Sequence, residues 1–168
     1  MVNFADYRKE GQFKLIGRVY SLNISKEKGT SKYPVTQIEV IENHGFKGDA
    51  HSGDHIRQVS FLSIENILYQ NNINQDNKID LVLKPGDYAE NITTQGIDLE
   101  KLNVGDDLLI GNDVELKISI RGKQCHNKCE IFKKVNSCIM PKQGLFAIVE
   151  KSGIIKIGDE IRVRRCLK

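Results

Sequence analysis

The chain has 168 residues, with 25 basic and 22 acidic side chains and therefore a net charge of +3 at pH 7. Apolar residues make up 39% of the chain and charged residues 28%, a composition that fits one ordinary globular domain and argues against disorder. The weak, interleaved charge gives no sign of nucleic-acid binding, and the lack of any apolar run of about 18 residues excludes a membrane-spanning helix.

Most of the predicted elements are strands. The clearest alternation of apolar and polar residues covers residues 114–120, which is the pattern of a half-buried strand. Gly-Asp turns, as at Gly105 and Gly158, precede two of the predicted strands, and short strands between such turns favour a barrel or sandwich over a parallel βαβ fold. The other predicted strands, in chain order, are residues 15–22, 37–42, 57–62, the strand that follows Gly105-Asp106 and ends at Ile110, 144–150, 155–157 and 161–163.

Helices are predicted to be few and short. Ser63 is a candidate N-cap for a helix over residues 64–69, and a second helix is predicted from about residue 127 to residue 135. The polar stretch 25–32 is predicted to be a flexible loop. The Asn-rich stretch 71–80 is predicted to be a surface loop.

The four cysteines, at positions 125, 129, 138 and 166, all lie in the last quarter of the chain. A secreted scaffold held by disulfides is usually smaller and richer in cysteine. The first ten residues include four charged ones and no apolar stretch, so we expect no secretory signal and a cytoplasmic protein. In a reducing cytoplasm the cysteines would be free thiols, some in the core and one or more with a chemical role.

Three polar stretches contain more charged and polar side chains than turns need, and the first two precede residue 95. Residues 45–57 contain two histidines, two aspartates, an arginine and three glycines, which suits anion binding but also fits a solvated turn. A metal site of Asp49, His51, Asp54 and His55 is a weaker alternative, because the spacing matches no established ligand set. In the second stretch, a Pro85-Gly86 turn is followed by Glu90 and Asn91, which would be ordinary loop-edge residues on local grounds alone.

The third polar stretch contains Cys125, directly after the best predicted strand. Its cationic neighbours and a following helix N-terminus would both favour thiolate over thiol, as a nucleophilic or metal-ligating sulfur requires. These neighbours are Arg121, Lys123, His126 and Lys128. Two alternatives stay open: small buried side chains at Cys129 and Cys138, and a zinc site of Cys125, His126, Cys129 and Cys138.

Five segments taken in chain order resemble the MOSC domain, which occurs at the C-terminus of molybdenum-cofactor sulfurases and as small stand-alone bacterial proteins. The matching segments are 48–53, 57–60, 85–86 with 90–92, 102–110 and Cys125. The resemblance covers about residues 17–163 and is strongest to the short bacterial type. It implies a single MOSC domain over residues 1–168, folded as a predominantly antiparallel β-barrel of the pyruvate kinase β-barrel type with a few short helices.

The resemblance also implies a site. Cys125 would carry sulfur as a persulfide or bind the molybdenum of the pterin cofactor. Arg57 and Arg121 would hold the pterin phosphate or an oxyanion, because arginine suits bidentate anion binding. The remaining residues implied to line the pocket are Asp49, His51, Gln58, Glu90 and Asn91.

The function implied is a sulfur carrier or transfer module for molybdenum cofactor or a related metal–sulfur species. The alternatives are a molybdenum-dependent reductase of N-hydroxylated compounds, with Cys125 as metal ligand, and a cofactor delivery protein without chemistry. The chain has no aminotransferase-like domain, so we expect no pyridoxal phosphate, and a cysteine desulfurase-type sulfur donor or an electron-transfer protein as partner. Cys129 is a candidate to resolve a persulfide on Cys125. Whether the protein is an enzyme, and its oligomeric state, stay open.

Overall fold

A computed structural model of the chain describes residues 13–122 and 130–166. Strands dominate the described residues, as the alternating sequence pattern predicts. They are β1 (Lys14–Ile24), β2 (Tyr33–Val35), β3 (Gln37–Ile41), β4 (Gly45–Phe46), β5 (Val59–Ser63), β6 (Ile92–Gln95), β7 (Asp107–Ile110), β8 (Val114–Arg121), β9 (Leu145–Lys151), β10 (Gly153–Lys156) and β11 (Glu160–Arg164).

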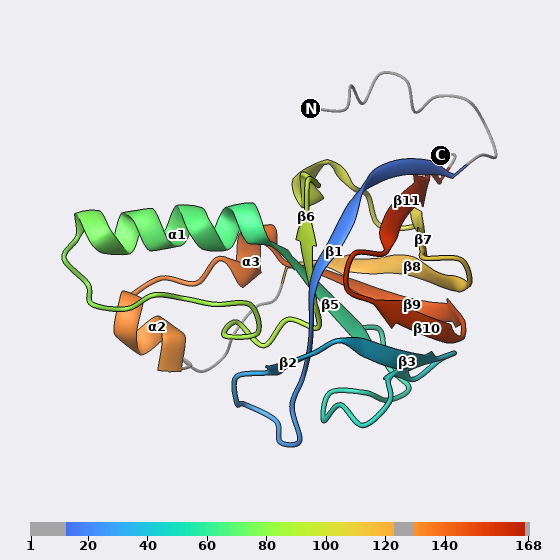
Figure 1. The fold of residues 1–168 in the computed structure, drawn as a ribbon, viewed down its shortest axis with the longest axis horizontal. Helices are drawn as coiled ribbons and strands as arrows, with labels where there is room; N and C mark the ends of the chain where they lie inside the picture. Colours follow the sequence, from blue (N-terminus) through green and yellow to red (C-terminus); the bar gives the residue numbers. More distant parts are fainter. Residues whose placement is uncertain (1–12, 123–129, 167–168) are drawn as a thin grey trace.

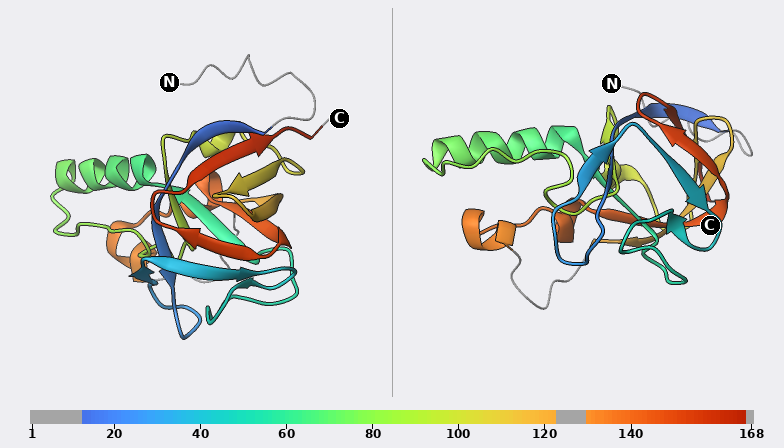
Figure 2. Two further views of the ribbon diagram at one scale, coloured as in Figure 1. Left: turned by 45° about the vertical axis from the view of Figure 1, so that its right-hand side comes forward. Right: turned by 60° about the horizontal axis from the view of Figure 1, so that its bottom comes forward.

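Seven of these strands close into a barrel. In the described part of the chain they pair in the order β11-β7-β8-β9-β5-β6-β1, and a further pairing of β1 with β11 joins the two ends. Among these seven, β5 and β6 run parallel and the other neighbours run antiparallel. Strand β2 extends the sheet beside β1, while β10, β3 and β4 form a smaller sheet (Figures 1 and 2). The predicted, predominantly antiparallel barrel is therefore confirmed.

The barrel interior is packed with aliphatic and aromatic side chains. On β8 the residues Val114, Leu116 and Ile118 are buried, and the residues between them are partly exposed, which is the predicted alternation. Because every buried side chain removes apolar surface from water, this core is the main stabilising element of the fold. Its largest fully buried members are Leu22, Phe46, Phe61, Ile92, Leu102, Leu108, Ile110, Leu116, Ile118 and Leu145.

The helices lie together on one side of the barrel (Figure 1). They are α1 (Ile64–Asp76), α2 (Glu130–Val135) and α3 (Met140–Gln143), and a 3-10 helix covers Leu99–Lys101. A second apolar cluster, which includes Leu62, Ile67, Met140 and Phe146, fills the space between the helices and the barrel. None of the helices in residues 13–122 and 130–166 is long and apolar enough to cross a membrane.

Helix α1 is longer than predicted. It begins after Ser63, whose Oγ accepts a hydrogen bond from the backbone N–H of Asn66, as expected for the N-cap. It continues to Asp76, so the prediction of a surface loop over residues 71–80 is wrong for the first six of them. The reason is that amides take the place of apolar contacts on its inner face: Asn71 exchanges two hydrogen bonds with the backbone of Leu83.

The second predicted helix agrees with α2 where the structure describes it. The helix occupies Glu130–Val135, and the earlier part of the prediction, from about residue 127, lies outside the described residues. The short helix α3 was not predicted. It begins with Met140 and Pro141, and proline is well tolerated in the first turn of a helix, where its missing N–H has no partner to lose.

Candidate functional site

A pocket of about 450 Å³ lies where the loop before β5 meets β9 and α3. Its lining combines four basic side chains with an apolar wall, and no carboxylate is among its lining residues in the described part of the chain. The lining residues are Lys28, His51, His55, Ile56, Arg57, Ser60, Tyr88, Ala89, Asn91, Met140 and Phe146. Such a lining suits an anionic ligand with a flat apolar body.

Arg57 is positioned by the aromatic ring of Phe146. Its guanidinium carbon lies 5.7 Å from the ring centroid, within the range of a cation–π contact. Phe146 is held opposite Ser60 by the antiparallel pairing of β5 with β9, so the ring is fixed by the barrel itself. An exposed arginine thereby gains a defined place at the pocket.

The imidazole ring of His55 stabilises the conformation of the loop that contains His51 and Arg57. The backbone N–H of Arg57 donates to Nδ1 of His55 at 3.1 Å. Because a backbone N–H can only donate, Nδ1 is the accepting nitrogen and Nε2 carries the hydrogen. Nε2 then donates to the carbonyl oxygen of His51 at 2.9 Å. Both ring nitrogens of His55 are therefore used to shape the loop.

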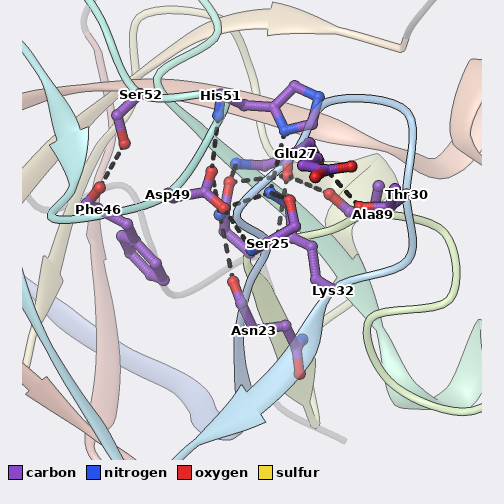
Figure 3. A network of polar contacts seen from close by, with 12 residues as sticks. Asn23, Ser25, Glu27, Thr30, Lys32, Phe46, Asp49, His51, Ser52 and Ala89 are labelled. Carbon is purple, nitrogen blue, oxygen red and sulfur yellow. Dashed lines mark hydrogen bonds and ion pairs between the residues drawn. The ribbon is translucent and has the colours of Figure 1, made fainter.

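Asp49, which is not itself a lining residue, is the centre of a buried polar network that includes the pocket residue His51 (Figure 3). Its Oδ1 accepts hydrogen bonds from Lys32 Nζ at 2.6 Å and from the N–H of Ser25 at 2.9 Å. Its Oδ2 accepts from the amide of Asn91 and the N–H of His51, each at 3.2 Å. Burial by itself would raise the pKa of Asp49, but the hydrogen bonds and the charge of Lys32 outweigh it and hold the pKa below its ordinary value.

Lys32 was not identified from the sequence as a site residue. Its side chain is 1% exposed, and its ammonium group donates to Asp49, to Nδ1 of His51 at 3.1 Å and to Oγ of Ser25 at 3.3 Å. The prediction that residues 25–32 form a flexible polar loop misses that both its ends, Ser25 and Lys32, are buried. No local signal marks this lysine, because its carboxylate partner is 17 residues away along the chain.

Asn91 lines the pocket, but its side chain already serves the fold. Its Oδ1 accepts from the N–H and the hydroxyl of Ser60, at 3.1 and 3.0 Å. Its amide nitrogen donates to the carbonyl oxygen of Asn23 at 3.3 Å and to Asp49. With two bonds accepted and two donated, the amide has its full complement of hydrogen bonds and ties β5, β1 and the Asp49 loop together.

Glu90 is fully buried beside the network rather than at the pocket lining. Its Oε1 accepts from the N–H of Gly86 at 2.6 Å and from the hydroxyl of Thr93 at 2.8 Å. Its Oε2 has no hydrogen-bond partner among the described residues. Burial raises the pKa of Glu90 to about 7, although the bonds from Gly86 and Thr93 act in the opposite direction. The carboxyl group is therefore partly protonated at neutral pH.

The other predicted site residues lie elsewhere. Gln58 is buried and its Oε1 accepts from the N–H of Val149 at 2.8 Å, which ties β9 to the residue before β5. The guanidinium of Arg121 donates to the carbonyl oxygens of Leu99 and Leu102. Neither side chain is among the pocket's lining residues. The structure thus gathers His51, Arg57 and Asn91 at the pocket, with Asp49 hydrogen-bonded to two of them, and Cys125 lies outside the described residues.

Gly86 allows the loop of Lys32 to approach the Pro85-Gly86 turn. It has a φ of +92°, and a Cβ at this position would collide with the carbonyl oxygen of Lys32. Gly86→Ala is expected to lower the free energy of unfolding by about 1–3 kcal/mol for the left-handed backbone, with a further loss from the collision. Urea denaturation measures this.

The matched control for that change is Gly29→Ala. Gly29 also has a positive φ, of +78°, but a Cβ there has no atom within 4 Å. This variant therefore carries the backbone cost alone. Equal losses of stability in the two variants would show that the approach of Lys32 to Gly86 is not a tight one.

The described residues offer little to a metal ion by themselves. In residues 13–122 and 130–166, no group of three or more His, Cys, Asp or Glu side chains is arranged to hold one. Asp49 is committed to Lys32 and His55 to its own loop, so the metal site considered for that segment gains no support. Cys138 is half-buried against the apolar cluster around α3, as a small core residue would be. The other members of the zinc alternative lie outside the described residues.

Comparison with known proteins supplies a family for this arrangement. The model of the MOSC domain matches residues 48–162. YuaD from Bacillus subtilis has a similar structure, with a TM-score of 0.73 and 21% identity over 93% of this chain and all of YuaD. YiiM from Escherichia coli is also similar, with a TM-score of 0.64 and 16% identity over 94% of this chain and 72% of YiiM. For YiiM from Geobacillus stearothermophilus the TM-score is 0.59 and the identity is 16%, over 92% of this chain and 76% of that protein. Identities this low show a shared fold, and no curated protein sequence matches the chain.

Proposed function

The chain belongs to the MOSC domain family, and from this premise we propose that it is a sulfur carrier or transfer module acting through Cys125. Its ligand would be molybdenum cofactor or a related metal–sulfur species, since the family is associated with molybdenum cofactor binding. The observation that carries the proposal is the pocket, whose lining combines basic side chains with an apolar wall.

The lining of the pocket fits the two parts of a pterin cofactor. Arg57, with Lys28 and His51 nearby, offers donors and positive charge to a phosphate or another oxyanion. The apolar wall of Met140 and Phe146 offers a surface for a flat ring system. When bound, the cofactor would supply molybdenum for redox or sulfur chemistry, and the protein would supply orientation and a thiolate.

The described residue that precedes the Cys125 segment lies against a wall of the pocket. The N–H of Gly122 donates to the carbonyl oxygen of Gly144 at 2.8 Å, and Gly122 packs on the backbone of Pro141. Pro141 belongs to α3, whose Met140 lines the pocket. Three residues of chain span at most about 11 Å. The chain therefore leaves the first described range at Gly122 beside a wall of the pocket, which supports the proposal that Cys125 acts together with it.

Sulfur loading needs no oxidant if the donor is itself a persulfide. The thiolate of Cys125 would attack the terminal sulfur of the donor's persulfide. The donor's S–S bond breaks as a new S–S bond forms on Cys125, and the donor leaves as a thiolate. Other cationic residues beside Cys125 in the sequence, Lys123 and Lys128, would favour the attacking thiolate form.

The test is to incubate reduced protein with a cysteine desulfurase and free cysteine, and then to measure intact mass. We expect a gain of one sulfur atom that a reductant removes, and no gain in Cys125→Ser. Cys138→Ser is the matched control, because Cys138 packs against the apolar cluster, and it should load like the parent. Loading of Cys125→Ser to the parent's level would contradict the proposal, as would a parent protein that takes up no sulfur.

The same pocket would serve the two alternatives. In a molybdenum-dependent reductase of N-hydroxylated compounds, Cys125 would ligate the metal and an electron-transfer protein would supply electrons. In a delivery protein, the basic side chains would hold the cofactor and Cys125→Ser would leave most of the function intact. Both predict bound pterin without a persulfide, which distinguishes them from the carrier.

A further inference from the structure

The ammonium group of Lys32 determines which nitrogen of His51 carries a hydrogen. An ammonium has three N–H bonds, and within the described part of the chain Lys32 Nζ has three acceptors within reach: Asp49 Oδ1 at 2.6 Å, His51 Nδ1 at 3.1 Å and Ser25 Oγ at 3.3 Å. Because the ammonium only donates, Nδ1 of His51 must accept. The hydrogen of the neutral ring is then on Nε2.

We propose that Lys32 is a positioning residue that holds His51 as the neutral Nε2–H tautomer, so that the pocket ligand meets a hydrogen-bond donor there. The inference rests on the proposed function only for the existence of that ligand. Its consequence is a preference for an acceptor, such as a phosphate or sulfur-anion oxygen, opposite His51. Arg57 would supply the positive charge, and the N–H of His51 would orient the acceptor atom of the ligand through a directional hydrogen bond.

The charged groups around His51 favour its neutral form. Lys32 faces Nδ1 directly, while Lys28 and Arg57 line the same pocket. The negative charge of Asp49 is already compensated by Lys32, and its Oδ2 accepts from the backbone N–H of His51. His55 donates to the carbonyl oxygen of His51. A proton on Nδ1 would place two cationic groups in contact, so the ring should resist protonation.

The test is nuclear magnetic resonance of the apo protein with labelled histidine. Long-range proton–nitrogen correlations distinguish a protonated from an unprotonated ring nitrogen. We expect an unprotonated Nδ1 and a protonated Nε2 in His51, unchanged down to about pH 5, well below the region where an ordinary histidine gains its proton. A short unstructured peptide that contains one histidine, measured under the same conditions, gives the reference. A His51 that becomes protonated in the same pH range as this peptide would overturn the proposal.

Variants separate positioning from folding. In Lys32→Met with Asp49→Asn, both charges of the buried pair are removed together, so no charge is left unpaired in the interior. His51 should then become protonated in the same pH range as the reference peptide. The matched control is Lys28→Met, on the same loop and also at the pocket, in which His51 should stay neutral as in the parent. A double variant whose His51 still stays neutral at about pH 5 would show that Lys32 is not the cause.

The outcome is independent of the proposed function. The measurement uses apo protein and needs neither cofactor nor sulfur donor. If His51 behaves as expected and neither sulfur nor pterin binds, the positioning role stands and the proposed function fails. If the protein loads sulfur but His51 is protonated in the same pH range as the reference peptide, the proposed function stands and the role of Lys32 fails.

Discussion

Lys32→Met is expected to lower the free energy of unfolding by about 3–5 kcal/mol, the usual cost of leaving one partner of a buried ion pair alone. The side chains of Lys32 and Asp49 are 1% and 0% exposed, so water cannot take the place of the lost ammonium group. Methionine reaches as far as the Cε atom of lysine but has no ammonium group and donates no hydrogen bond. The acceptors on Asp49, His51 and Ser25 each lose a partner in the same step.

Urea denaturation at neutral pH measures this loss. Lys28→Met removes the same charge from an exposed position on the same loop and should change stability by no more than about 0.5 kcal/mol. Lys32→Met combined with Asp49→Asn should recover a large part of the loss, because the uncompensated charge is gone. A loss below about 1 kcal/mol in Lys32→Met would mean that the pair is open to solvent.

Glu90→Gln is expected to change how stability depends on pH. The pKa of Glu90 is raised from 4.5 to about 7 in the folded protein, so the folded state holds a proton that the unfolded chain has released. Its contribution to stability is therefore present in full below about pH 4.5 and is lost as the pH rises through about 7. Glutamine resembles the protonated carboxyl group and does not ionise.

The variant should gain stability relative to the parent by about 2–3 kcal/mol between pH 5 and pH 8. Urea denaturation at several pH values gives the difference at each. Glu27→Gln, at an exposed position, is the matched control and should follow the parent. Asp49 acts with the opposite sign, because its lowered pKa makes the protein lose stability as the pH falls. Parallel curves for the parent and Glu90→Gln would contradict a buried carboxyl group that titrates near neutral pH.

The strands could be predicted from the sequence because each buries one face. Apolar and polar residues then alternate along the strand with a period of two. The alternation over residues 114–120 corresponds closely to β8, and the apolar run at 144–150 to β9. The full extent of α1 could not be predicted in the same way. Its inner face is secured partly by amides such as Asn71 and Asn74, which look like solvent-facing residues in a sequence.

Part of the candidate site could be predicted from family resemblance, which identified His51, Arg57 and Asn91 at the pocket. Local sequence could not show that Gln58 binds the backbone of Val149 or that Arg121 binds carbonyl oxygens near Leu102. These partners are set by how the barrel closes. The role of Lys32 was missed for the same reason, because a lysine in a polar loop normally faces water.

The most direct test of the pocket and Cys125 acting together is to purify the protein, without reductant, from a host that makes molybdenum cofactor. Intact mass, molybdenum and pterin are then measured on the same sample of the parent, Cys125→Ser and Arg57→Gln. We predict pterin in the parent, at least about tenfold less in Arg57→Gln because a charged hydrogen-bond donor is lost, and an added sulfur that is absent from Cys125→Ser. A parent without pterin or added sulfur, or three proteins loaded alike, would contradict this role for the pocket and its thiol.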